Sequence, residues 1–155
     1  MHHSIILLPA LLALCQAIPA SLDQEPQNSF CAGDKSVAGF CTALTYTDKT
    51  DSASPTTSNC EDTCRGILSD AGDWGVDFAG RPAGWRDNMY IGACEFSVSR
   101  EKDGDASAFA FSMKNQDILD LVDESIDRFA GKHGNKVKAE GTMNCQGHVV
   151  RWYVG

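Results

Sequence analysis

The stretch NQDILDLVDESIDRFA, residues 115–130, decides the fold class because its apolar residues recur at the spacing of an α-helix. Asn115 is a good N-cap, and the basic Arg128 and Lys132 lie near the negative end of the helix dipole. We therefore predict a helix over residues 115–132. The stripe that should pack on a sheet consists of Ile118, Val122, Ile126 and Phe129, widened by Leu119 and Ala130.

Alternating segments on both sides of this helix predict strands. Before it, residues 94–98 and 108–113 alternate in polarity, and the Asp103-Gly104 pair between them is a hairpin signal. After it, residues 137–145 and 149–154 alternate in the same way around the turn Gln146-Gly147. We therefore expect one hairpin before the helix and one after it.

The first part of the chain contains shorter elements. Residues 39–46 predict a strand, and a turn-forming loop follows it. A short helix should begin near Ser58 or Asn59 and stop near Gly72. A half-buried strand over residues 74–78 and a long loop over residues 80–92 complete the series. Together these elements indicate an α+β fold, a disulfide-stapled two-layer sandwich of a mostly antiparallel sheet with two helices.

The amino terminus predicts secretion. Residues 5–18, IILLPALLALCQAI, form an apolar run that is too short to span a bilayer and that a polar stretch follows. We expect a signal peptide over residues 1–20, cleaved after Ala17 or Ala20, then a flexible leader over residues 21–35 and a single domain over residues 36–155. No other segment approaches transmembrane length, so we expect an extracellular protein without a membrane span.

The composition narrows the classes of partner. The chain has 155 residues, of which 43% are hydrophobic, enough to build a core. Its formal net charge of −8 argues against a nucleic-acid binder, which needs a basic face. Six of the seven cysteines follow the signal peptide, and an even set in an oxidising compartment usually pairs.

A search for catalytic or metal-binding residues favours structural interpretations. Only His133 and His148 follow the signal peptide, and neither has a partner at a metal-binding spacing. We therefore expect no catalytic residue, no cofactor and no metal. The acidic residues of the long helix should form a solvated face; they are Asp117, Asp120, Asp123, Glu124 and Asp127. Trp85, in a glycine-bounded loop beside Arg81 and Arg86, is the candidate for a surface contact.

Six blocks in residues 52–155 resemble the necrosis-inducing-factor domain of secreted fungal effectors, a family founded on an extracellular virulence protein of a leaf-mould fungus. In order, they are SPTTSNC, AGDW, GACEFSV, NQDILDLVDESIDRFA, VKAEGTMNC and VVRWYVG. The resemblance implies an effector that promotes virulence or plant cell death in the host apoplast, with no catalytic residues to carry over. Its partner would be an unknown host protein or cell-surface component, and we assume a monomer.

Two alternatives to a non-enzymatic effector remain open. The domain is similar in layout to fungal killer toxins, small α/β sandwich proteins thought to block calcium channels, although the acidic charge departs from basic killer toxins. The chain could also be a small secreted hydrolase, which would need a polar cleft with a perturbed acid or histidine.

The cysteine spacing restricts the disulfides without choosing among all pairings. Cys60 and Cys64 share a helix face, where a bridge between them is geometrically poor, so each should reach a separate partner. Cys60–Cys94 is our first choice, and the layout of the family also favours it. For the remaining four cysteines we expect Cys41–Cys64 and Cys31–Cys145, the latter tying the leader to the penultimate strand.

Overall fold

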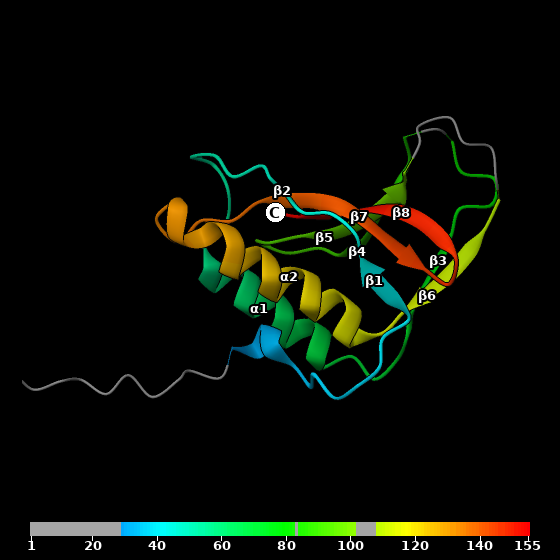
Figure 1. Cartoon of the computed structure of the whole chain (residues 1–155), viewed down its shortest axis with the longest axis horizontal. Helices are drawn as coiled ribbons and strands as arrows, with labels where there is room; N and C mark the ends of the chain where they lie inside the picture. Colours follow the sequence, from blue (N-terminus) through cyan, green and yellow to red (C-terminus); the bar gives the residue numbers. More distant parts are fainter. Residues whose placement is uncertain (1–28, 83, 102–107) are drawn as a thin grey trace, which may run out of the picture.

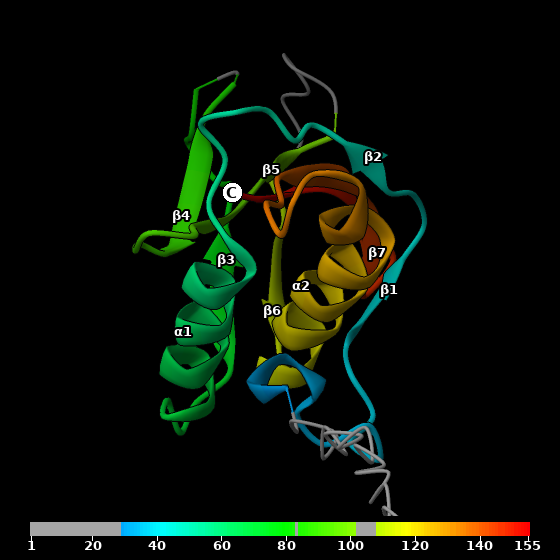
Figure 2. The same ribbon diagram turned by 90° about the vertical axis from the view of Figure 1, so that its left-hand side faces the viewer.

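Two helices lie side by side on one face of an antiparallel sheet (Figures 1 and 2). The computed structural model describes residues 29–82, 84–101 and 108–155. The helices there are η1 (Phe30–Ala32), α1 (Thr57–Leu68), α2 (Asn115–Phe129) and η2 (Ala130–Lys132). The strands are β1 (Cys41–Ala43), β2 (Thr47–Asp48), β3 (Trp74–Asp77), β4 (Arg86–Tyr90), β5 (Phe96–Arg100), β6 (Ala110–Met113), β7 (Ala139–Cys145) and β8 (His148–Val154). The expected α+β class is confirmed.

The main sheet has the order β1-β7-β8-β5-β4, with β2 also paired to β7. Each of its pairs is antiparallel, and so is the separate ribbon of β3 and β6. The hairpin of β7 and β8 is confirmed. Gln146 and Gly147 both have positive φ at its turn, which matches the twist of the two strands.

The hairpin expected before α2 is wrong. β5 lies between β4 and β8, whereas β6 pairs with β3. The Asp103-Gly104 pair lies outside the described residues. The long loop expected over residues 80–92 is also interrupted, because it contains β4. This strand is a polar edge strand with an irregularity between Asn88 and Tyr90, so it lacks the apolar alternation that predicts a strand.

The short helix α1 begins at Thr57, one or two residues earlier than expected. Thr56 and Asn59 form a capping box: the Asn59 amide donates to the Thr56 hydroxyl, and the Thr56 amide donates to the Asn59 side chain. The helix buries one face, formed by Cys60, Thr63, Cys64 and Ile67.

The long helix spans the expected range, because α2 continues directly into η2. Ile118 and Val122 are fully buried, and Ile126 is half-buried against the core. The expected N-cap is wrong, because Lys114 precedes the helix and takes that position. The Asn115 side chain instead accepts a hydrogen bond from Trp74 Nε1 at 2.6 Å and donates one to the Asp70 carbonyl at 2.8 Å.

Three disulfides cross-link the domain, and one of them joins the helices to the sheet. The structure contains the expected Cys60–Cys94 bridge, which joins α1 to the segment before β5. The other two expected pairings are wrong, since Cys41 bonds to Cys145 and Cys31 bonds to Cys64. The antiparallel register of β1 and β7 places Cys41 directly opposite Cys145, and η1 packs against α1 beside Cys64. Both contacts depend on tertiary packing, which cysteine spacing does not reveal.

The end of the expected flexible leader belongs to the folded domain. Cys31 is fully buried, and η1 contacts both α1 and α2 (Figure 2). The expected signal peptide and residues 21–28 lie outside the described residues, so that part stays a prediction. Across the described ranges, every helix is too short or too polar to cross a membrane.

Candidate functional site

A groove of about 780 Å³ lies where η1 and α1 face the carboxyl end of α2. One side is formed by η1 and α1, and the other by α2 and η2. The residues that determine its character are Phe30, Glu61, Arg65, Ile126, Asp127 and Gly131. The groove lies on the helical layer, away from the sheet.

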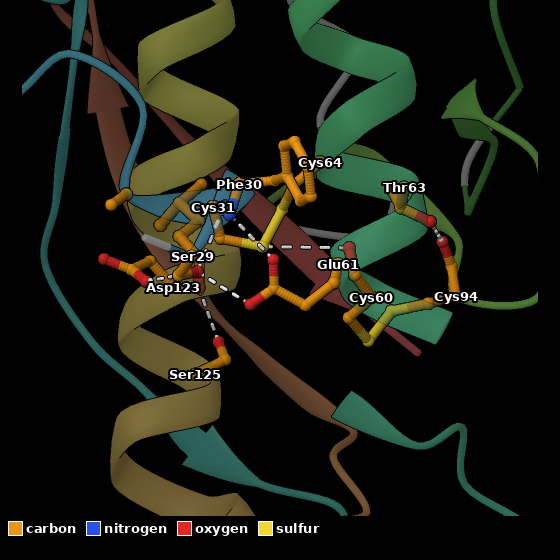
Figure 3. The surroundings of a disulfide bond; sticks show 12 residues. Ser29, Phe30, Cys31, Cys60, Glu61, Thr63, Cys64, Cys94, Asp123 and Ser125 are labelled. Atoms are coloured by element: carbon orange, nitrogen blue, oxygen red, sulfur yellow. Dashed lines mark hydrogen bonds between the residues drawn. A yellow bond between two sulfur atoms is a disulfide. The ribbon is translucent and has the colours of Figure 1, made fainter. Parts of the chain in front are cut away.

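The η1 wall of the groove is held by covalent and polar contacts with α1 (Figure 3). The Cys31–Cys64 bridge fixes η1 to the middle of α1. The Glu61 carboxylate accepts a hydrogen bond from the Ser29 hydroxyl at 2.7 Å and another from the Phe30 amide at 2.8 Å. Because Glu61 lies one turn before Cys64, the same face of α1 holds η1 twice.

Apolar side chains form part of the groove surface between its polar residues. Phe30 is 43% exposed, and the Arg65 guanidinium lies 4.3 Å from the centre of its ring. Ile126 is half-buried, and Ala130 is buried beside it. A Cβ atom at Gly131 would meet no heavy atom within 4 Å, so the groove is open at this point.

Several carboxylates near the groove are paired with cations. Lys35 Nζ lies 2.8 Å from Asp120 and 2.9 Å from Asp123. Burial alone would lower the pKa of Lys35, but these hydrogen bonds outweigh it and raise that pKa. Asp62 pairs with Arg65 at 2.5 Å. The Asp62–Arg65 pair is neutral, whereas Lys35 balances only one of its two carboxylates.

Glu61 and Asp127 differ from these neighbours because no cation among the described residues neutralises them. Glu61 accepts hydrogen bonds from two neutral groups. Asp127 is exposed and has neither a hydrogen bond nor an ion pair within the described residues. The two carboxylates come from α1 and α2, on opposite sides of the groove, and therefore give it an uncompensated negative charge.

The expectation of a solvated acidic face is wrong for Asp117. This residue is only 5% exposed, and its carboxylate accepts hydrogen bonds from the amides of Phe40, Cys41 and Lys114 at 2.8–3.1 Å. A Cβ atom at Gly39 would lie 1.9 Å from the Asp117 carboxylate, so a glycine is required at that close approach. The available sequence signal was an acidic residue in the first turn of the helix, where a carboxylate can bind free backbone amides.

Of the three residues predicted to form a surface contact, only two lie against each other. Arg81 lies 4.4 Å from the Trp85 ring centre, and Trp85 is half-buried edge-on against Phe78. Arg86 lies instead over the ring of Tyr153, at 3.5 Å. A role for these residues in binding stays a prediction.

Both histidines of the described chain make structural contacts. His133 Nε2 lies 2.7 Å from Asp48 Oδ2, and the His148 ring stacks on Phe109 with centres 4.3 Å apart. A hydrogen bond from the Thr50 amide, with a further one from His133, lowers the pKa of Asp48 to about 2. Within the described residues, no group of three or more His, Cys, Asp or Glu side chains is arranged to hold a metal ion.

The fold and groove define a small disulfide-bonded domain with a concave surface. The chain matches the Hce2 family, described as "Pathogen effector; putative necrosis-inducing factor", over residues 40–145, and it belongs to this family. The predicted family resemblance is therefore confirmed. The match begins after η1, so the wall containing Phe30 and Cys31 lies outside the matched range.

The chain is also similar to part of a much longer fungal protein. It is 32% identical over 118 residues to a protein of Penicillium expansum named "Probable chitinase LysM18". The similar region covers 72% of this chain but only 8% of that relative. The two proteins therefore share one domain-sized region.

Proposed function

We propose that the protein is a secreted effector that promotes host plant cell death by binding a host component without catalysing a reaction. The observation that carries this proposal is the match to a pathogen-effector family over residues 40–145. The apolar run over residues 5–18 supports secretion, and three disulfides suit an extracellular protein.

The use of the reactive side chains supports binding rather than catalysis. The cysteines of the described chain are joined in disulfides, so they offer no thiolate nucleophile. His133 is paired with Asp48, and His148 is stacked on Phe109. The groove between the helices instead combines exposed apolar side chains with charged ones, as a recognition surface does.

Leaf infiltration tests the proposed function. The mature protein, produced with its disulfides, is compared with the same protein after reduction and alkylation. We expect cell death around the native sample only, because the recognition surface depends on the disulfide-bonded fold. Absence of a response in every host leaf tested would refute the proposal, and so would equal activity of the reduced protein.

A second candidate is an antagonist of competing microbes, in the manner of a killer toxin. It is favoured by the similarity to part of a relative named for chitinase activity, since chitin occurs in fungal cell walls. Applying the mature protein to fungal and bacterial cultures separates this candidate from the first. Growth arrest without any leaf response would favour it. Release of sugar from chitin by the mature protein alone would favour the third candidate, a secreted hydrolase.

A further inference from the structure

We propose that the groove between α1 and α2 is the docking site for a basic, amphipathic segment of the host partner. This inference rests on the proposed function, because it names the kind of partner that an effector of this shape would bind. It concerns a surface with one wall, η1, outside the family match.

Charge is the first argument for a basic partner. The formal net charge is −8, which steers positively charged partners toward the molecule. Glu61 and Asp127 lie on opposite sides of the groove, and within the described part of the chain neither has a neutralising cation. The positive amino end of α1 and the negative carboxyl end of α2 both border the groove, so the partial charges of the two helix dipoles offset each other. The carboxylates therefore determine the sign of the charge in the groove.

Exposed apolar side chains beside the two carboxylates are the second argument, because this combination favours a peptide. Phe30 and Ile126 offer apolar surface between the two carboxylates. A lysine or arginine side chain can lay its aliphatic stem along such a surface while its charged end reaches a carboxylate. A helical segment with apolar residues at one-turn spacing and basic residues beside them matches this combination.

The chain's own leader is a poorer occupant. Ser29 lines the groove, and residues 21–28 of the leader directly precede it in the sequence. Those residues read SLDQEPQN and include Asp23 and Glu25, which would bring negative charge to a negative groove. A second copy of this acidic chain meets the same repulsion.

Fluorescence anisotropy with two labelled probe peptides tests the proposal on the mature protein. One probe is a short amphipathic helix of lysines and leucines, and the other has glutamate in place of each lysine. We expect only the lysine probe to bind, with affinity falling as salt is raised. Equal binding of the glutamate probe would overturn the proposal, and so would displacement of the lysine probe by a chitosan oligosaccharide but not by unlabelled peptide.

Two pairs of variants test whether the lysine probe binds in the groove. Asp127→Asn should weaken binding by up to about fivefold, the range of an exposed ion pair, whereas Asp73→Asn, the same change at an exposed site outside the groove, should not. Gly131→Gln should block the open part of the groove, whereas Gly131→Ala should retain binding. Equal loss with Asp73→Asn, or full binding by Gly131→Gln, would show that the probe binds elsewhere.

The leaf assay distinguishes a failure of the proposed docking site from a failure of the proposed effector function. If native protein causes cell death and Gly131→Gln causes it equally, the effector function holds and the groove is not its docking site. If native protein causes no cell death but binds the lysine probe in the groove, the proposed function fails while the binding site stands.

Discussion

At the residue scale, the Asp117 carboxylate joins the amino end of α2 to the chain that leads into β1. It accepts hydrogen bonds from the amides of Phe40, Cys41 and Lys114. We predict that Asp117→Ala lowers the free energy of unfolding by about 2–3 kcal/mol, because three partly buried amides lose their acceptor. Urea unfolding measures this change.

Asp120 provides the control for that prediction. It lies on the same helix, but it is half exposed and contacts the flexible side chain of Lys35. Asp120→Asn should change the free energy of unfolding by no more than about 0.5 kcal/mol. Similar losses for the two variants would contradict the distinction between a buried acceptor and a surface carboxylate.

Asp48 gives a prediction for acid stability. Its pKa is lowered from 3.8 to about 2, chiefly by the Thr50 amide and further by His133. A group with a lowered pKa in the folded state stabilises the protein above its unfolded pKa and loses that contribution as the pH falls through the folded value. Between about pH 4 and pH 2, Asp48→Asn should therefore flatten the fall in melting temperature. An unchanged slope would contradict this, and Asp73→Asn is the matched control.

At the element scale, α2 is predicted to be the helix on which folding depends. Val122 is fully buried, whereas Val149 on β8 is 42% exposed. We expect Val122→Asp to bury an unpaired charge and cost about 4 kcal/mol or more, which would abolish secretion or folding. Val149→Asp introduces the same charge at an exposed site and should be secreted normally. Secretion of Val122→Asp at the wild-type yield, with unchanged melting, would show that the packing of α2 is misassigned.

The elements that local patterns predicted are those whose signals lie within a few residues. The extent of α2 with η2 follows from its apolar period, and the β7–β8 hairpin follows from alternation around Gln146 and Gly147. β2 and β4 were missed because they are short or polar strands at the sheet edge, where one side is solvated. The partner of β5 was misassigned because strand pairing is decided by tertiary contacts rather than by the intervening turn.

The candidate site was less predictable than the fold. Its acidic residues on α2 follow from the sequence, but the contact between Glu61 and Phe30 does not, because it forms only once η1 packs on α1. The buried role of Asp117 likewise depends on the loop before β1, which crosses the helix at Gly39. No short-range pattern records such contacts between segments far apart in the chain.

At the scale of the whole molecule, disulfides bring the ends of the described domain together. Cys41–Cys145 spans 104 residues and joins β1 to β7. In the chain-entropy account, a loop of this size contributes about 4.7 kcal/mol by restricting the unfolded chain. Cys31–Cys64 spans 33 residues and holds the wall on which the proposed docking groove depends.

We propose, as the central claim, that the chain is a secreted domain held by three particular disulfides, one of which fixes a wall of the groove. Peptide mapping of the secreted, non-reduced protein tests it most directly, because one experiment reports the mature amino terminus and every cysteine pair. The predicted result is cleavage after Ala17 or Ala20, with Cys31–Cys64, Cys41–Cys145 and Cys60–Cys94 as the recovered pairs. Recovery of Cys31 linked to Cys145, or of a free thiol among these six cysteines, would contradict the account.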